Sequence, residues 1–240
     1  MLSEGKYSRT YHFSFSPGTT SDDRINHDWW EDIKKIKTIM LTEKMDGEND
    51  CINQFGVFAR SHGAITRNPW ANFLKEKQAI IKGDLGELEL FGENVYAIHS
   101  IIYPEIEEHF YIFAIRENGV WLSWEDIEIY SNALNIPTVP VLGIWSYDDT
   151  KDEEIQKKEL EELVTKLSQE PSVFGSIDTI TNKPCSREGI VARNILSYPV
   201  DKFKENVYKF VRKGHVKTNS HWTRNWKRAP LKHEREAKNK

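Results

Sequence analysis

Two apolar runs of the chain are joined by the stretch Thr42-Glu43-Lys44-Met45-Asp46-Gly47-Glu48-Asn49. The run before it, residues 36–41, is typical of a strand, and residues 51–60 after it form a second one. A lysine that ends a buried strand suits a covalent nucleophile, because its amine attacks only after losing its proton. Burial or nearby positive charge must therefore lower its pKa from about 10.4.

The same stretch allows a simpler interpretation. Asp-Gly is a common hairpin turn, so Asp46 and Gly47 alone indicate no more than a polar turn between two strands. In the functional interpretation, Gly47 lets the backbone pass close to a ligand, while Asp46 and Glu48 orient the amine or hold a metal. The rest of the sequence has to decide between the two.

Length and composition indicate a folded, soluble protein. The 240 residues suffice for one large domain, or one domain with a small appendage, and 38% hydrophobic residues can fill its core. No apolar run approaches the roughly 18 residues of a membrane span, and residues 1–6 lack the apolar segment of a signal peptide. Cys51 and Cys185 lie far apart, which argues against a disulfide framework or a cysteine-rich zinc site. We expect a reducing, cytoplasmic location and no membrane partner.

The net charge of −4 conceals a strongly basic C-terminal end. Residues 202–240 contain 13 Lys and Arg against 3 Asp and Glu, whereas residues 1–201 contain 20 against 34. A basic end on an acidic body favours a phosphate-rich partner, although basic tails are often only solvated. Tryptophans and cations alternate in this end, which suits stacking on bases beside phosphate contacts. The nucleic-acid candidates here are Trp222, Arg224 and Lys227.

Short strands with interspersed helices predict an α+β domain without a βαβ rhythm. Apolar patterning and turn residues place the strands at residues 7–16, 36–41, 51–60, 88–93, 110–115, 139–145, 186–193 and 207–216. Capping residues and helical spacing place helices through Trp30, Ile33 and Ile36, after Asn68-Pro69, from Ser123 and over residues 152–170. An Asp22-Asp23 pair fits a turn or cap better than a metal site. We expect one domain over residues 1–214 and a basic C-terminal arm over residues 215–240.

Polar residues at the strand ends form an ordered set. A nucleophilic lysine, further cations and two lone acids together suit a triphosphate with its metal ions. The set comprises Lys44, Asp46, Gly47, Arg60, Gly92, Glu93, Phe113, Glu188, Gly189, Lys209, Arg212 and Lys213. The strings around it are Ser16-Pro17-Gly18, Ala59-Arg60-Ser61, Phe91-Gly92-Glu93-Asn94, Glu188-Gly189-Ile190-Val191 and Phe210-Val211-Arg212-Lys213-Gly214-His215-Val216.

This ordered set resembles the covalent nucleotidyltransferase superfamily of polynucleotide ligases and mRNA capping enzymes. Within the superfamily it is most similar to the ATP-dependent RNA ligases. The resemblance implies a ligase-type nucleotidyltransferase domain, ATP-grasp-like, with antiparallel sheets flanked by helices and without an oligonucleotide-binding-fold domain. It also implies ATP and Mg²⁺, with Mn²⁺ as an alternative metal. The partners it implies are RNA with 5′-phosphate and 3′-hydroxyl ends, DNA or a hybrid duplex being open alternatives.

The resemblance implies a role for each residue of the set. Lys44 is the nucleophile that takes up AMP, Glu43 lies at the adenine edge with its backbone reading the base, and Phe113 stacks on adenine. Glu93 is the ribose acid, Arg60 reaches ribose or a 5′-phosphate, and Asn49 holds a metal-bound water or the nucleic-acid end. The implied metal ligands are Glu188 and, from its position behind the lysine, Asp46. Cations for the α-phosphate, which would also lower the pKa of Lys44, come from Lys209, Arg212 and Lys213.

Each role has an alternative, purely structural interpretation. Lone acids such as Glu93 and Glu188 are usually strand-end surface groups, Phe113 suits core packing, and Lys209 suits an edge strand. The chain also departs from the family pattern, since the usual final motif has two lysines two residues apart.

Three other functions remain open. A capping guanylyltransferase would use the same lysine with GTP but normally needs an oligonucleotide-binding-fold domain, and a DNA nick ligase is disfavoured on similar grounds. The third is a non-catalytic nucleic-acid binder on the same fold.

Overall fold

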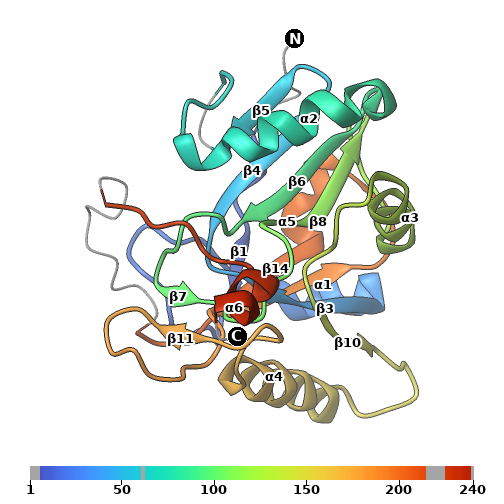
Figure 1. Ribbon diagram of the computed structural model, residues 1–240. Helices are drawn as coiled ribbons and strands as arrows, with labels where there is room; N and C mark the ends of the chain where they lie inside the picture. The colour runs from blue at the N-terminus through green and yellow to red at the C-terminus, as the bar shows by residue number, and fades with distance from the viewer. Residues whose placement is uncertain (1–5, 61–62, 215–224, 239–240) are drawn as a thin grey trace.

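The computed structural model describes residues 6–60, 63–214 and 225–238, and two six-stranded sheets dominate it (Figure 1). The first sheet has the order β10 (Val141–Ser146), β3 (Thr38–Lys44), β12 (Gly189–Asn194), β14 (Val207–Val211), β1 (Tyr11–Phe13) and β2 (Ile25–Asn26). The second has the order β13 (Tyr198–Pro199), β9 (Val120–Trp121), β8 (Phe110–Glu117), β6 (Glu89–Asn94), β4 (Glu48–Asn53) and β5 (Gly56–Ala59). A small third sheet pairs β7 (Ile101–Ile102) with β11 (Ile177–Asp178).

Strand pairing is mostly antiparallel, as expected. The exceptions lie at one edge of the first sheet, where β1 runs parallel to both β14 and β2. The described strands close into no barrel, so the architecture is α+β with open sheets.

Helices cover the outer faces of both sheets (Figure 1). α1 (Trp29–Ile36) and α4 (Glu153–Gln169) pack on the first sheet, and α2 (Asn72–Leu85) and α3 (Trp124–Leu134) pack beside the second. The remaining helical segments are η1 (Pro69–Ala71), η2 (Val200–Lys202), α5 (Phe203–Asn206) and α6 (Lys232–Lys238). None of the helices in the described part of the chain is long and apolar enough to cross a membrane.

The two-residue period of the strands decides which side chains face the space between the sheets. On β12, Ile190 and Ala192 are buried in the core under α1 and α4, so Val191 lies on the opposite face. On β14, Tyr208 and Phe210 join the same core, which leaves Lys209 facing inward. Alternation along β3 and β12 likewise brings Lys44 and Arg193 to the inner side.

Several expected boundaries are confirmed and others shift. Ser123 caps α3 by accepting a hydrogen bond from the Asp126 N–H at 3.2 Å, and Asp152 caps α4 through the Ile155 N–H at 3.0 Å. The side chain of Asn68 does not cap the helical turn that begins at Pro69. Its Nδ2 donates a hydrogen bond to Glu48 instead. The strands expected over residues 7–16 and 207–216 are shorter, ending at Phe13 and Val211 respectively.

Residues 225–238 lie against the body of the molecule. The Ala229 N–H donates to the Tyr96 carbonyl at 2.7 Å, and the Ile98 N–H donates to the Lys227 carbonyl at 2.9 Å. Ala229 is buried, and the Trp226 ring contacts Tyr96. This part of the predicted C-terminal arm therefore adds a short strand-like edge to the domain.

Candidate active site

A cavity of about 390 Å³ lies between the two sheets, at the end of β3. Its size is within the range of small-molecule sites in proteins. Residues from both sheets and from the segment before β1 line it: Tyr7, Thr10, Glu43, Lys44, Met45, Gly47, Glu48, Asn49, Ala59, Arg60, Asn68, Glu93, His99, Phe113, Val139, Val191, Arg193 and Lys209. The structure therefore gathers seven of the predicted site residues around one space: Glu43, Lys44, Asn49, Arg60, Glu93, Phe113 and Lys209.

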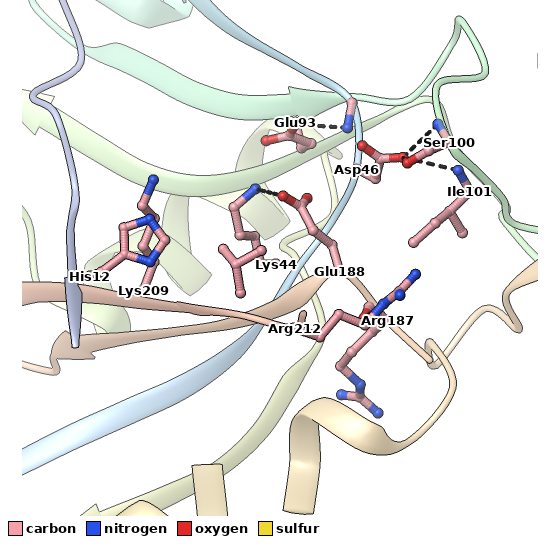
Figure 2. Close-up of polar contacts among 12 residues, drawn as sticks. His12, Lys44, Asp46, Glu93, Ser100, Ile101, Arg187, Glu188, Lys209 and Arg212 are labelled. Atoms are coloured by element: carbon pink, nitrogen blue, oxygen red, sulfur yellow. Dashed lines mark hydrogen bonds and ion pairs between the residues drawn. The ribbon is translucent and has the colours of Figure 1, made fainter. Parts of the chain in front are cut away.

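Lys44 ends β3, and its amine contacts a carboxylate from the neighbouring strand. Antiparallel pairing sets Lys44 opposite Gly189, so Glu188, the residue before β12, reaches the lysine with Oε1 at 2.5 Å from Nζ (Figure 2). Burial lowers the pKa of Lys44, but the charges of Glu188 and Glu93 outweigh it and raise that pKa. The expected lowering of the lysine pKa by neighbouring cations is therefore wrong, because the charges of the nearby carboxylates dominate.

Glu93 lies on β6 and is the second acid beside Lys44. Its Oε1 accepts the Gly47 N–H at 3.0 Å, which ties the loop after β3 to the second sheet (Figure 2). Burial raises the pKa of Glu93 to about 8, although the nearby Lys44 charge opposes this. A carboxyl group with such a pKa ionises readily when further positive charge arrives in the pocket.

Asp46 holds the loop before β7. Its Oδ2 accepts hydrogen bonds from Ser100 N at 2.8 Å, Ser100 Oγ at 2.7 Å and Ile101 N at 2.9 Å (Figure 2). Gly47 lets the chain pass close to the backbone of β6, whereas a ligand was the expected neighbour. A Cβ at this position would lie 2.5 Å from the Asn94 carbonyl oxygen. The glycine is thus required by the adjacent β6 backbone.

The adenine-site candidates lie on opposite walls. Phe113 of β8 is only 8% exposed, lines the cavity and meets Tyr7 edge-to-face, with ring centroids 5.1 Å apart. Glu43 is 1% exposed, and its N–H, the proposed base reader, donates to the Pro140 carbonyl at 2.9 Å. Its Oε2 accepts the Val173 N–H at 3.0 Å.

The predicted phosphate cations separate in the structure. Lys209 faces the cavity, whereas Arg212 and Lys213 follow the end of β14 and are not among the lining residues. Residues two apart on a strand share a face, so a second cation beside Lys209 would have to occupy position 211. That position holds Val211. Arg212 instead donates from Nε to the Arg187 carbonyl at 3.0 Å.

Several lining residues were missed from the sequence. Arg193 could have been found from alternation on its strand, since Ile190 and Ala192 are apolar and Arg193 lies on the other face. Tyr7 and Thr10 fall in the expected strand over residues 7–16 but are irregular in the structure, as is His99. Their positions depend on how the two sheets meet.

The acidic residues fit a divalent cation only in part. Within residues 6–60, 63–214 and 225–238, no group of three or more His, Cys, Asp or Glu side chains is placed to hold a metal ion. Mg²⁺ and similar ions are commonly bound through one or two carboxylates together with substrate phosphates. Glu188, which contacts Lys44, and the nearby Glu93 suit that shared form of binding (Figure 2).

The nucleic-acid candidates are only partly described. Trp222 and Arg224 lie outside the described residues. Lys227 is exposed on the strand-like edge beside Tyr96, and Arg60 is exposed after β5 at the pocket. Asn49 lines the same pocket from β4.

The two open sheets around this pocket give the chain the fold of solved RNA ligases. The RNA ligase family model matches residues 37–211, and the chain belongs to the RNA ligase family. The search of curated proteins found no match.

Solved RNA ligase structures share the fold. Naegleria gruberi RNA ligase with PPi is 17% identical, with a TM-score of 0.52 and coverage of 88% of this chain and 61% of that one. A mutant of the same ligase with ATP and Mn is 18% identical, with a TM-score of 0.51 and coverage of 90% and 61%. An archaeal ATP-dependent RNA ligase is 16% identical, with a TM-score of 0.44 and coverage of 73% and 43%. The chain thus spans about three-fifths of the Naegleria ligase chains.

Proposed function

We propose that this protein is an ATP-dependent RNA ligase that joins 5′-phosphate and 3′-hydroxyl ends. The observation that carries the proposal is the position of Lys44, whose amine enters the pocket beside Glu188 and Glu93 from two other strands. Membership of the RNA ligase family supports it, as do the solved structures of Naegleria gruberi RNA ligase with ATP, AMP or PPi. Two free cysteines agree with the cytoplasmic location, which stays a prediction.

The reaction begins at the Lys44 amine. Attack of Nζ on the α-phosphorus of ATP forms a P–N bond, breaks the bond to pyrophosphate and gives lysyl-AMP. The amine must first lose a proton, and Glu188 Oε1 at 2.5 Å is the acceptor it already contacts. A 5′-phosphate oxygen then displaces Lys44 from AMP, and finally a 3′-hydroxyl attacks the adenylated end and releases AMP.

The rest of the pocket aligns the nucleotide and balances its charge. Phe113 offers an aromatic face to adenine, Glu93 is placed for the ribose, and Lys209 supplies a cation for the phosphates. When bound with the nucleotide, Mg²⁺ or Mn²⁺ would be held by Glu188 and would neutralise phosphate charge. Because phosphoryl transfer depends mainly on alignment and charge, these residues suffice for its chemistry.

Incubation with α-labelled ATP or GTP and Mg²⁺, followed by denaturing electrophoresis, tests the proposal. We expect covalent label from ATP alone, released when a 5′-phosphorylated RNA strand is added. Label from GTP would favour a capping guanylyltransferase. Absence of label from both nucleotides would favour a binding protein without catalysis. A matrix of RNA and DNA strands then shows which ends are sealed.

Phe113→Leu should raise the KM for ATP about tenfold, since stacking of a base on an aromatic ring is worth about 1–3 kcal/mol. Leucine retains the apolar bulk of a side chain that is 8% exposed. Its effect on kcat should be smaller, because adenine lies far from the reacting phosphorus. Steady-state adenylation kinetics check this, with Phe55→Leu as an exposed control outside the pocket. An unchanged KM would show that adenine does not stack on Phe113.

Lys227→Ala should weaken binding of a 5′-phosphorylated RNA strand while leaving adenylation by ATP unchanged. Lys227 is exposed on the segment that lies along residues 96–98, outside the residues that line the ATP pocket. Loss of one phosphate contact should also reduce the salt dependence of binding by about one counterion. Fluorescence anisotropy over a range of salt concentrations measures both. Slower adenylation with unchanged strand binding would contradict this division.

A further inference from the structure

His12, Asp23 and Lys209 form a polar cluster on the wall of the pocket. Parallel pairing of β1 with β14 sets His12 directly beside Lys209 (Figure 2). Nζ of Lys209 lies 3.2 Å from Oδ1 of Asp23, and Nε2 of His12 lies 3.1 Å from the same oxygen. None of the functions proposed above uses Asp23 or His12, although Lys209 lines the cavity.

The hydrogen bonds around His12 give its ring one orientation. Ser16 Oγ accepts the Val211 N–H at 3.0 Å, faces the Val211 carbonyl oxygen at 3.5 Å, and lies 2.9 Å from His12 Nδ1. Burial and the Lys209 charge lower the pKa of His12 to about 4, so its ring is neutral at pH 7. Nε2 of this neutral ring lies 3.1 Å from Asp23 Oδ1, so His12 packs directly against the carboxylate.

Asp23 is held on both of its carboxylate oxygens. Oδ2 accepts from the N–H and the Oγ1 of Thr20, each at 3.0 Å, while Oδ1 faces His12 and Lys209. Burial raises the pKa of Asp23, but the Thr20 hydrogen bonds and the Lys209 charge outweigh it and hold that pKa below its usual range. The cluster therefore contains one anion, one cation and a neutral imidazole.

A hydrolytic role for this cluster does not fit. Serine, histidine and aspartate occur together, but Ser16 is buried and accepts a hydrogen bond from the backbone of β14. Ser16 is also not among the residues that line the cavity. A nucleophilic hydroxyl needs access to a substrate, so the side chains must serve another purpose.

We propose that Asp23 is a positioning residue, which with His12 and Thr20 fixes the Lys209 ammonium toward the phosphates of the nucleotide. This inference rests on the proposed adenylation reaction. A lysine side chain is long and flexible and loses rotamer entropy when it binds a phosphate, so an ammonium that is already fixed binds at a smaller entropic cost. Electrostatic catalysis depends on charges that are aligned before the reaction starts.

The titratable groups around Lys209 come from four segments. His12 lies on β1, Asp23 on the loop before β2, Lys44 on β3, and Glu188 immediately before β12. Burial and the Lys44 charge lower the pKa of Lys209, while the Asp23 and Glu188 charges oppose this. Removal of the Asp23 charge should therefore lower the pKa of Lys209 further, so that the ammonium is lost at a lower pH.

The test is Asp23→Asn, measured by single-turnover adenylation across pH. We expect a rate about tenfold lower, as for loss of one hydrogen bond to a charged group, and an alkaline limb that begins at lower pH. Asp22→Asn is the matched control, because Asp22 is the exposed neighbour outside the pocket. Thermal unfolding of each variant shows whether the fold is retained.

A double-mutant cycle separates positioning from general support of the fold. In a Lys209→Met background, Asp23→Asn should change the adenylation rate less than twofold, because its effect passes through Lys209. An equal loss in both backgrounds, or an unshifted alkaline limb, would overturn the proposal.

A direct measurement of the Lys209 amine by lysine-labelled NMR is independent of activity. We expect its pKa to fall in Asp23→Asn and to stay unchanged in Asp22→Asn. An unchanged Lys209 pKa in Asp23→Asn overturns the proposed contact. A shifted pKa in a protein that forms no lysyl-AMP would instead show that the contact exists and that the adenylation reaction is wrong.

Discussion

Lys44→Ala is expected to abolish covalent labelling by ATP. The amine is the atom that forms the bond to AMP, and alanine has no group to replace it. The side chain extends from the end of β3 into the pocket, so its removal should leave the two sheets intact. Denaturing electrophoresis after incubation with labelled ATP measures the effect.

Lys82→Ala is the control for Lys44, since Lys82 is exposed on α2 and lies outside the pocket. It should label like the unmodified protein. The Lys44 variant should still seal a strand that is supplied already adenylated, because the last step needs no new lysyl-AMP. Continued labelling of Lys44→Ala would place the nucleophile elsewhere.

Glu188→Gln should slow adenylation about a hundredfold, the lower range for loss of one aligned electrostatic group. Glu188 contacts Nζ of Lys44 at 2.5 Å, so glutamine removes both a proton acceptor and the charge that holds the amine. It also removes the carboxylate best placed to share a divalent cation with the nucleotide. Single-turnover rates at saturating ATP and metal measure the loss.

Glu170→Gln is the matched control, because Glu170 is a partly exposed acid that pairs with Arg187 at 3.6 Å outside the pocket. Its rate should stay within about twofold of the unmodified protein, because Glu170 is itself solvated and the buried Arg187 also donates to the Pro171 carbonyl. If Glu188→Gln adenylated as fast as this control, the contact seen at Lys44 would have no part in the reaction.

The sequence predicted the fold and the centre of the site because both leave local signals. The continuous apolar run of residues 110–115 indicated the strand that forms β8, and Ser123 and Asp152 indicated where two helices begin. The ordered set around Lys44 and Glu93 indicated a nucleotide pocket, and the structure brings these side chains together.

Pairing between distant strands left no such signal. The contact of Lys44 with Glu188 depends on β3 pairing with β12, which raises the lysine pKa where neighbouring cations were expected to lower it. Arg212 was chosen for its place in a basic string, yet β14 ends one residue earlier, and its Nε binds a backbone carbonyl. His12 drew no attention because its partners lie on a loop and on β14.

The central claim is that Lys44 takes up an adenylate. Mass spectrometry of the intact protein and its peptides, after incubation with ATP and Mg²⁺, tests it most directly. The account predicts one added AMP group, lost in acid, on the peptide that contains Lys44. An unmodified Lys44, or AMP attached to another residue, would contradict it.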